Sequence, residues 1–215
     1  GIQTARAVQN FAISGRGPDR DFTRAHILIK QAAATANLQA GWLAPDKAAA
    51  IIAACERILA GEFADQFVVD RFQAGAGTSH NMNSNEVIAN VANVALGSER
   101  GRYQPIHPND DVNMGQSTND TIPTAIRLAL LAKIPRLLAT LEHMAARFDA
   151  IADAERATVK SARTHLQDAV PTTIGREFAA YGWALRRAAA RLDETQASLA
   201  QVGLGGSAAG TALNT

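Results

Sequence analysis

Apolar residues recur every three or four positions over most of the chain, a spacing that predicts a mainly helical fold. One helix is expected over residues 21–41 and another over 45–59, where proline fits the first turn and Gly61 follows the last. Glycine and proline interrupt residues 1–20, which we expect to be irregular. The apolar run at residues 67–69 is compatible with a strand or with a buried turn.

A glycine-rich segment, residues 73–79, precedes the next expected helix. Asn83 followed by Glu86 resembles a capping box, so this helix is expected to begin there and to end at Gly97. The glycines permit unusual backbone angles and the close approach of a ligand. The segment matches neither a P-loop nor a dinucleotide-binding fingerprint. Residues 98–115, which include two prolines, are expected to form a loop.

Two stretches in the second half place apolar residues at alternating steps of three and four, the pattern of a coiled-coil seam. The first seam comprises Ile134, Leu137, Leu141, Met144, Phe148 and Ile151. The second comprises Phe178, Tyr181, Leu185, Ala188, Leu192, Leu199 and Val202, with the polar Thr195 in register. Pro135 should bend or break the first helix, and Gly203 is expected to cap the second. Long helices with narrow seams need neighbours, so we expect a multi-helix bundle shared between subunits.

The composition narrows the classes of function. The chain has 215 residues, 47% of them hydrophobic, and a net charge of +1, with no lysine- or arginine-rich block that would indicate nucleic-acid binding. Its one cysteine, Cys55, lies in an apolar helical run and fits a buried thiol in the reducing cytoplasm. No apolar run is long enough to cross a bilayer, so no membrane partner is expected.

Short hydrogen-bonding side chains gather at residues 116–120 (Gln-Ser-Thr-Asn-Asp), directly before the first long helix. Asp120 can cap that helix, and Pro123 fits its first turn. Free backbone N–H groups and the positive end of the helix dipole then lie beside neutral donors, which suits a carboxylate or a phosphate. Taken alone, such residues are more often a polar helix cap without a ligand. Two other segments, Thr78-Ser79 and Thr164-His165, carry similar groups.

Taken together, these segments resemble the signature regions of the aspartase/fumarase superfamily of lyases, and the resemblance extends over essentially the whole chain. The motifs that carry it are Gly77-Thr78-Ser79-His80-Asn81-Met82-Asn83-Ser84-Asn85-Glu86-Val87, His107-Pro108-Asn109-Asp110-Asp111-Val112-Asn113, Gln116-Ser117-Thr118-Asn119-Asp120, Arg163-Thr164-His165-Leu166-Gln167-Asp168-Ala169 and Leu204-Gly205-Gly206-Ser207-Ala208-Ala209-Gly210-Thr211.

The resemblance implies an architecture and an assembly. Residues 1–115 would form an N-terminal helical domain, and residues 116–215 would form the first part of the central helix-bundle domain. The protein would be a homotetramer in which each active site is built from three subunits, without a metal or an organic cofactor. Family members continue well past Thr215, with a mobile Gly-Ser-Ser loop that supplies the catalytic base, and nothing in this sequence matches that loop. We therefore expect the N-terminal part of a longer enzyme, inactive alone.

The resemblance also implies a chemistry. The family removes a proton beside one carboxylate of a small four-carbon dicarboxylate, and the resulting aci-carboxylate dianion loses ammonia or water to leave fumarate. Thr164 and His165 are implied as catalytic residues, and Asn119 as the residue on the amine or hydroxyl side. The implied substrate-binding residues are Thr78, Ser117, Thr118, Asn119, Thr164 and His165. A second, non-catalytic anion site is implied at His107, Asn109 and Asp110.

Two branches of the superfamily fit the motifs. Residues 75–79, with Ala76 where fumarases tend to have a serine, resemble aspartases, as do residues 1–4 and 113–119. The turn at residues 107–110 resembles fumarases instead. We expect the elimination of ammonia from L-aspartate, with the hydration of fumarate as the alternative. A catalytically silent helical assembly is a third possibility, because the superfamily has relatives that serve as structural proteins.

Overall fold

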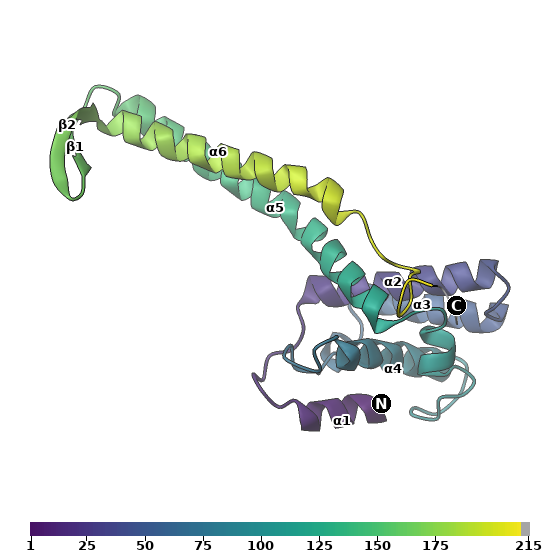
Figure 1. Ribbon diagram of the computed structural model, residues 1–215. Helices are drawn as coiled ribbons and strands as arrows, with labels where there is room; N and C mark the ends of the chain where they lie inside the picture. The colour runs from purple at the N-terminus through teal and green to yellow at the C-terminus, as the bar shows by residue number, and fades with distance from the viewer. Residues whose placement is uncertain (212–215) are drawn as a thin grey trace. The chain divides into compact units, whose positions relative to one another are not determined.

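A computed structural model describes residues 1–211, and it confirms the mainly helical fold (Figure 1). The chain divides into two compact units, Gly1–Ala129 with Gln201–Thr215, and Leu130–Ala200. Residues 212–215 lie outside the described part. In chain order the elements are α1 (Ile2–Asn10), α2 (Arg20–Gln39), α3 (Pro45–Leu59), the 3-10 turn η1 (Ala64–Gln66), α4 (Thr78–Ala95), the π-helical turn η2 (Pro108–Val112), α5 (Thr118–Ala154), β1 (Val159–Thr164), β2 (Gln167–Thr173) and α6 (Ile174–Leu199).

The core of the first unit lies between α2, α3 and α4. Ile27 of α2, Ile51 of α3 and Ile88 of α4 are fully buried in one apolar cluster. The helices α2 and α3 lie side by side, and α1 packs against α4 (Figure 1). A smaller cluster joins α2 to the first turns of α5 through Ala25, Ile29, Ala125 and Ala129. Small side chains at this contact let the start of α5 approach α2 closely.

Two expectations for the first unit are wrong. Residues 2–10 form α1 because Thr4 and Ala7 are buried on one face of a short helix, and the chain-breaking residues begin only at Gly15. The helix α4 begins at Thr78 rather than at Asn83. Asn83 and Glu86 match a capping box in sequence, but both are buried inside α4, where they bind other segments.

The second unit is a helical hairpin in which α6 runs back along α5 (Figure 1). Phe148 of α5 contacts Phe178 and Tyr181 of α6, with ring centroids 5.8 Å apart in both pairs. The helix α5 is continuous through Pro135. Of the two outcomes expected at Pro135, a bend or a break, the break is therefore absent.

The strands β1 and β2 join α5 to α6 as an antiparallel pair, in the segment that sequence analysis described only as an interruption. Val159 pairs with Thr173 and Thr164 with Gln167, with an irregularity between Ser161 and Arg163. The helix α6 ends at Leu199 with Ala200 as its cap, so the expected cap at Gly203 is wrong.

Within residues 1–211, no helix has the length and apolar character needed to cross a membrane. The domain boundary expected between residues 115 and 116 remains a prediction, since the two compact units describe contacts within this chain alone.

Candidate active site

Ser117 caps α5. Its hydroxyl oxygen accepts the backbone N–H of Asn119 at 3.2 Å, and the carboxylate of Asp120 accepts the backbone N–H of Ser117 at 3.0 Å. This reciprocal pair is a capping box with aspartate at its third helical position. The sequence predicts Asp120 as the cap of this helix, but the cap is Ser117, and Asp120 completes the capping box. Pro123 lies in the second turn of the helix rather than in its first turn.

Asp120 also holds the glycine-rich segment that follows α6. Its second carboxylate oxygen accepts the backbone N–H groups of Gly205, at 3.3 Å, and Ser207, at 3.0 Å. The side-chain amide of Asn119 donates to the carbonyl of Ala208 at 3.0 Å. One buried carboxylate thus ties the start of α5 to a segment 85 residues away in the sequence.

The start of α4 lies against the start of α5. Gly77 precedes α4 with a φ of +81°, and a Cβ atom there would lie 3.1 Å from the side chain of Ile122. Glycine therefore fits this position for both its backbone angle and its close approach. The first turn of α4 is capped from outside, because the backbone N–H of His80 donates to Gln73 Oε1 at 2.6 Å. Thr78, the first residue of α4, is exposed.

A buried polar cluster links these two helix starts to α2. Lys30 Nζ donates to Asn81 Oδ1 and to Asn113 Oδ1, both at 2.8 Å. Asn81 Nδ2 donates in turn to Asn113 Oδ1 at 3.2 Å and to Thr118 Oγ1 at 3.4 Å. Burial lowers the pKa of Lys30 to about 7, although the nearby Asp120 carboxylate raises it.

Two buried histidines lie beside this cluster. The rings of His26 and His80 are 5.1 Å apart between centroids, and His80 contacts Phe22. Burial, with the Lys30 charge, lowers the pKa of His80 to about 4 and that of His26 well below its usual value. Both side chains are therefore neutral near pH 7, and we assign them to the packing between α2 and α4.

Thr164 and His165 lie at the end of the β1–β2 hairpin. His165 and Leu166 form the two-residue turn between the strands, with φ of 47° and 62°. Positive φ at both central positions defines a type I′ turn, which normally selects Asn-Gly. Thr164, His165 and Leu166 are exposed. The turn therefore presents the imidazole to solvent in a backbone conformation that is uncommon for residues other than glycine.

The structure brings part of the expected site together. Thr78, Ser117, Thr118 and Asn119 lie in the first unit, where the starts of α4 and α5 meet. Thr164 and His165 belong to the second unit. A site composed of all six residues remains a prediction.

The expected second anion site is a self-capped turn. His107 precedes η2, and its Nδ1 accepts the backbone N–H groups of Asn109, at 3.3 Å, and Asp110, at 3.1 Å. Accepting at Nδ1 places the ring proton on Nε2 in the neutral form. The backbone N–H of His107 donates to Asp111, which pairs with Lys47 at 2.9 Å. Asn109 and Asp110 are exposed, and anion binding here remains a prediction.

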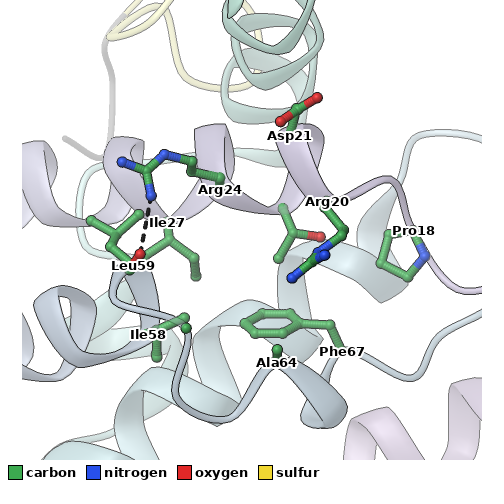
Figure 2. Close-up of a pocket in the computed structure, with 11 residues that line it drawn as sticks. Pro18, Arg20, Asp21, Arg24, Ile27, Ile58, Leu59, Ala64 and Phe67 are labelled. Atoms are coloured by element: carbon green, nitrogen blue, oxygen red, sulfur yellow. Dashed lines mark hydrogen bonds between the residues drawn. The ribbon is translucent and has the colours of Figure 1, made fainter.

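A surface pocket elsewhere in the first unit contains none of the expected site residues (Figure 2). It has a volume of about 280 Å³, with Ile58 and Phe67 among its apolar lining and Arg20 at its side. Arg24 Nη1 donates to the carbonyl of Leu59 at 3.0 Å, which satisfies the last residue of α3 (Figure 2). Among residues 1–211, no group of three or more His, Cys, Asp or Glu side chains is placed to hold a metal ion.

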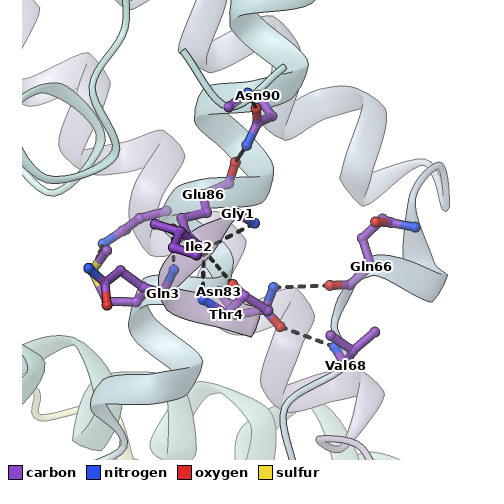
Figure 3. Close-up of polar contacts among 12 residues, drawn as sticks. Gly1, Ile2, Gln3, Thr4, Gln66, Val68, Asn83, Glu86 and Asn90 are labelled. Atoms are coloured by element: carbon purple, nitrogen blue, oxygen red, sulfur yellow. Dashed lines mark hydrogen bonds and ion pairs between the residues drawn. The ribbon is translucent and has the colours of Figure 1, made fainter. Parts of the chain in front are cut away.

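Glu86 is the centre of a second polar network, which serves the fold (Figure 3). Its buried carboxylate accepts the backbone N–H groups of Gln3, at 3.0 Å, and Thr4, at 2.9 Å, together with the hydroxyls of Thr4 and Tyr103. Burial alone would raise the pKa of Glu86, but these hydrogen bonds hold it at about 2. Glu86, which the sequence predicts as part of a helix cap, instead anchors α1 on α4.

Comparison with known proteins decides the family, because a family model described as Lyase matches residues 1–215. The chain belongs to this lyase family. An aspartate ammonia-lyase from Pseudomonas canavaninivorans is 49% identical over 218 residues, which cover 100% of this chain and 46% of the relative. A class II fumarate hydratase from Halobacterium salinarum is 49% identical over 216 residues, with the same two shares.

The fold of this lyase segment agrees with a solved relative. The crystal structure of fumarate lyase:delta crystallin from Brucella melitensis bound to cobalt matches with a TM-score of 0.95 and 52% identity, over 100% of this chain and 47% of that one. The resemblance to the aspartase/fumarase superfamily is thereby confirmed. The chain spans about half the length of the relatives it matches.

Sequence analysis assigned no role in the lyase site to Lys30, Asn81, Asn113 or Gln73. One signal for Lys30 is its position four residues after His26 and three after Ile27, which places it on the inward face of α2. A lysine on such a face needs buried partners. The helical pattern does not reveal that those partners are the amides of two separate segments.

Proposed function

We propose that the full-length protein eliminates ammonia from L-aspartate to give fumarate. The reaction removes a proton next to an ionised carboxylate, so the enzyme has to stabilise a dianion on that group. Hydrogen-bond donors fixed in place before the reaction do this well, and losing one typically costs about 10²- to 10³-fold in rate. The proposed donors are Thr78, Ser117, Thr118, Thr164 and His165, with Asn119 on the amine side. Thr164 and His165 are the proposed catalytic pair.

One observation at the start of α5 carries this proposal. The hydroxyl oxygens of Ser117 and Thr118 already accept hydrogen bonds, from Asn119 N and Asn81 Nδ2 respectively. Each hydroxyl therefore has its own proton available to donate to a substrate carboxylate. The same turn carries the positive end of the dipole of a 37-residue helix. Two O–H donors at a positive helix end form a surface that is complementary to an anion.

Ala76 favours aspartate as the substrate. In this superfamily a serine at that position helps fumarases to bind the hydroxy acid, and alanine offers no such hydroxyl. The second candidate, fumarate hydratase, is favoured by the turn at residues 107–110. Relatives of both kinds are 49% identical to this chain, so identity does not choose between them.

We also propose that the full-length protein is a cytoplasmic homotetramer whose active sites combine three subunits. The resemblance stated above supports this assembly, which would allow the hairpin of one subunit to meet the helix starts of others. Because the chain covers about 46% of its relatives, both activity and assembly are proposed for the full-length protein.

Fumarate absorbs ultraviolet light, so the full-length protein can be assayed directly with aspartate and with malate. Formation of fumarate and ammonia from aspartate supports the proposal. Turnover of malate alone would establish the hydratase instead, and turnover of neither would contradict both.

The site assignment is tested with Ser117→Ala, which should reduce kcat by about 10²- to 10³-fold because one donor is lost. Thr140→Ala is the matched control, since the Thr140 hydroxyl donates within α5 to the carbonyl of Arg136 at 2.9 Å. Equal activity of the two variants would exclude Ser117 from the site.

A further inference from the structure

Lys30 is fully buried, and a buried lysine is rare unless something specific surrounds it. Both of its hydrogen bonds described above go to neutral amide oxygens rather than to a carboxylate. Two amide contacts compensate poorly for the desolvation of an ammonium group. An aliphatic side chain would avoid this desolvation but would take the ammonium donor away from Asn81 Oδ1 and Asn113 Oδ1, so the lysine is tied to these two amides.

The ammonium group fixes the orientation of both amides. It can only donate, so the oxygens of Asn81 and Asn113 must face it. The NH2 group of Asn81 is then turned toward Thr118 Oγ1, at 3.4 Å. The NH2 group of Asn113 is turned toward the carbonyl of Gln116, at 3.2 Å, in the turn that leads into α5. One charge on α2 thereby sets the hydrogen-bond direction on α4 and at the start of α5.

The geometry points to Lys30 as a positioning residue of the proposed active site, acting through Asn81. With Lys30 in place, the Thr118 hydroxyl oxygen accepts a hydrogen bond from Asn81, and its proton is directed toward the substrate. This inference rests on the proposed function, because it assigns a task to a residue behind the same site. Lys30 does not touch the substrate in this scheme. Its effect reaches the substrate through the direction of a single O–H bond.

Asn81→Asp separates positioning from mere packing. The substitution keeps the shape of the side chain and gives Lys30 a carboxylate partner, and this ion pair offsets the hydrogen bond from Asn81 Nδ2 to Asn113 Oδ1 that is lost, so the fold should be retained. The new carboxylate accepts the Thr118 proton, however, and withdraws that donor from the substrate. A purely structural role for the cluster predicts unchanged turnover in this variant. A positioning role predicts that kcat falls by about 10²-fold while the melting temperature does not fall.

Lys30→Met removes the ammonium, and Lys47→Met is its matched control. Lys47 pairs with Asp111 outside the Lys30 cluster, so the control loses the same chemical group at another place. In the full-length protein, Lys30→Met should lose at least tenfold in kcat and Lys47→Met should not.

The pH profile gives a second test. The wild-type kcat should fall as rising pH deprotonates Lys30, and this decline should be absent from the profile of Lys30→Met. The groups that face Lys30 and affect where the decline occurs are His26 on α2, Cys55 on α3, His80 on α4 and Asp120 on α5.

Succinate, a diacid that cannot undergo elimination, gives a readout that does not depend on turnover. Its Kd, measured by calorimetry, should rise about tenfold in Asn81→Asp, as expected for one lost hydrogen bond to a charged group, and stay unchanged in Lys47→Met. If the wild-type protein turns over neither aspartate nor malate, the proposed function fails and the succinate Kd alone decides the role of Lys30. A folded Asn81→Asp protein with wild-type kcat, or with wild-type succinate affinity where turnover is absent, overturns the inference.

Discussion

At the scale of single residues, the hairpin turn shows where local preference and proposed function conflict. His165 and Leu166 both adopt left-handed backbone angles, which cost non-glycine residues roughly 1–2 kcal/mol each. Such outliers persist where the surroundings or the function require a particular side chain. Leu166 is 93% exposed, so packing does not explain why it stays in this turn. The imidazole of His165, held at the end of the hairpin, is the better explanation.

The double variant His165→Asn with Leu166→Gly tests this interpretation in the full-length protein. Asn-Gly is the preferred sequence for a type I′ turn, so the melting temperature should stay the same or rise. Turnover should fall by at least about 10²-fold, because the proposed catalytic imidazole is gone. The single variant Leu166→Gly is the control, since it relaxes the turn but keeps His165 and should stay within a few-fold of wild-type kcat. A similar loss in the single variant would mean that the backbone shape, rather than the imidazole, matters.

Residue-level prediction from the sequence succeeds where the chemistry is local. Ser117, Thr118 and Asn119 are recognisable because short polar groups before an apolar helical run indicate a helix start. Lys30 and Asn81 are harder to predict, because their roles depend on contacts 51 residues apart. Asp120 falls between these cases: its capping role is local, but its hold on Gly205 and Ser207 is not.

At the scale of elements, tertiary contacts decide the boundaries that local patterns leave open. The capping-box pattern at Asn83 and Glu86 is locally sound, yet α4 begins five residues earlier. Asn83 binds the backbone of Gln66 and Val68, and Glu86 binds α1, so both are used across the fold. The actual cap, Gln73, lies seven positions before His80, so it acts across the glycine-rich turn and the first residues of α4. The sequence pattern therefore finds the helix but not its first residue.

Gly175 makes a testable prediction about the packing of α5 against α6. A Cβ atom there would lie 2.5 Å from the carbonyl oxygen of Ala152 and 2.9 Å from that of Glu155, both backbone atoms that cannot move aside cheaply. Helix propensity favours Gly175→Ala by about 1 kcal/mol, but this clash should cost about 1–3 kcal/mol or more. We therefore expect the variant to lower the melting temperature by several degrees, as measured by circular dichroism.

Gly203→Ala is the matched control, because a Cβ atom at Gly203 meets nothing within 4 Å and its backbone angle is not left-handed. It should leave the melting temperature nearly unchanged or slightly higher. If Gly175→Ala were as stable as this control, α6 would have to begin further from α5 than described here.

At the scale of the whole molecule, the seam of α5 divides into two rows. Ile134 is buried and Phe148 contacts α6, so this row is satisfied within the chain. The other row is Leu137, Met144 and Ile151, whose exposures are 48%, 43% and 38%. A row of large apolar side chains at seven-residue spacing is the usual contact surface of a further helix. The heptad pattern thus predicts a second partner for α5, which the described residues do not include.

Light scattering on the full-length protein should therefore give the mass of a tetramer, and a charge in the exposed row should reduce it. Leu137→Glu with Met144→Glu places two carboxylates where apolar contact between helices is expected, so we expect a species of smaller mass. Turnover should also be lost, because each proposed active site needs three subunits. His143→Glu is the control, since His143 is an exposed neighbour of Met144 outside the seam, and it should leave the mass unchanged. A monomeric wild-type protein with full activity would contradict the shared site, whereas a tetrameric double variant would show that the subunits meet through a different face.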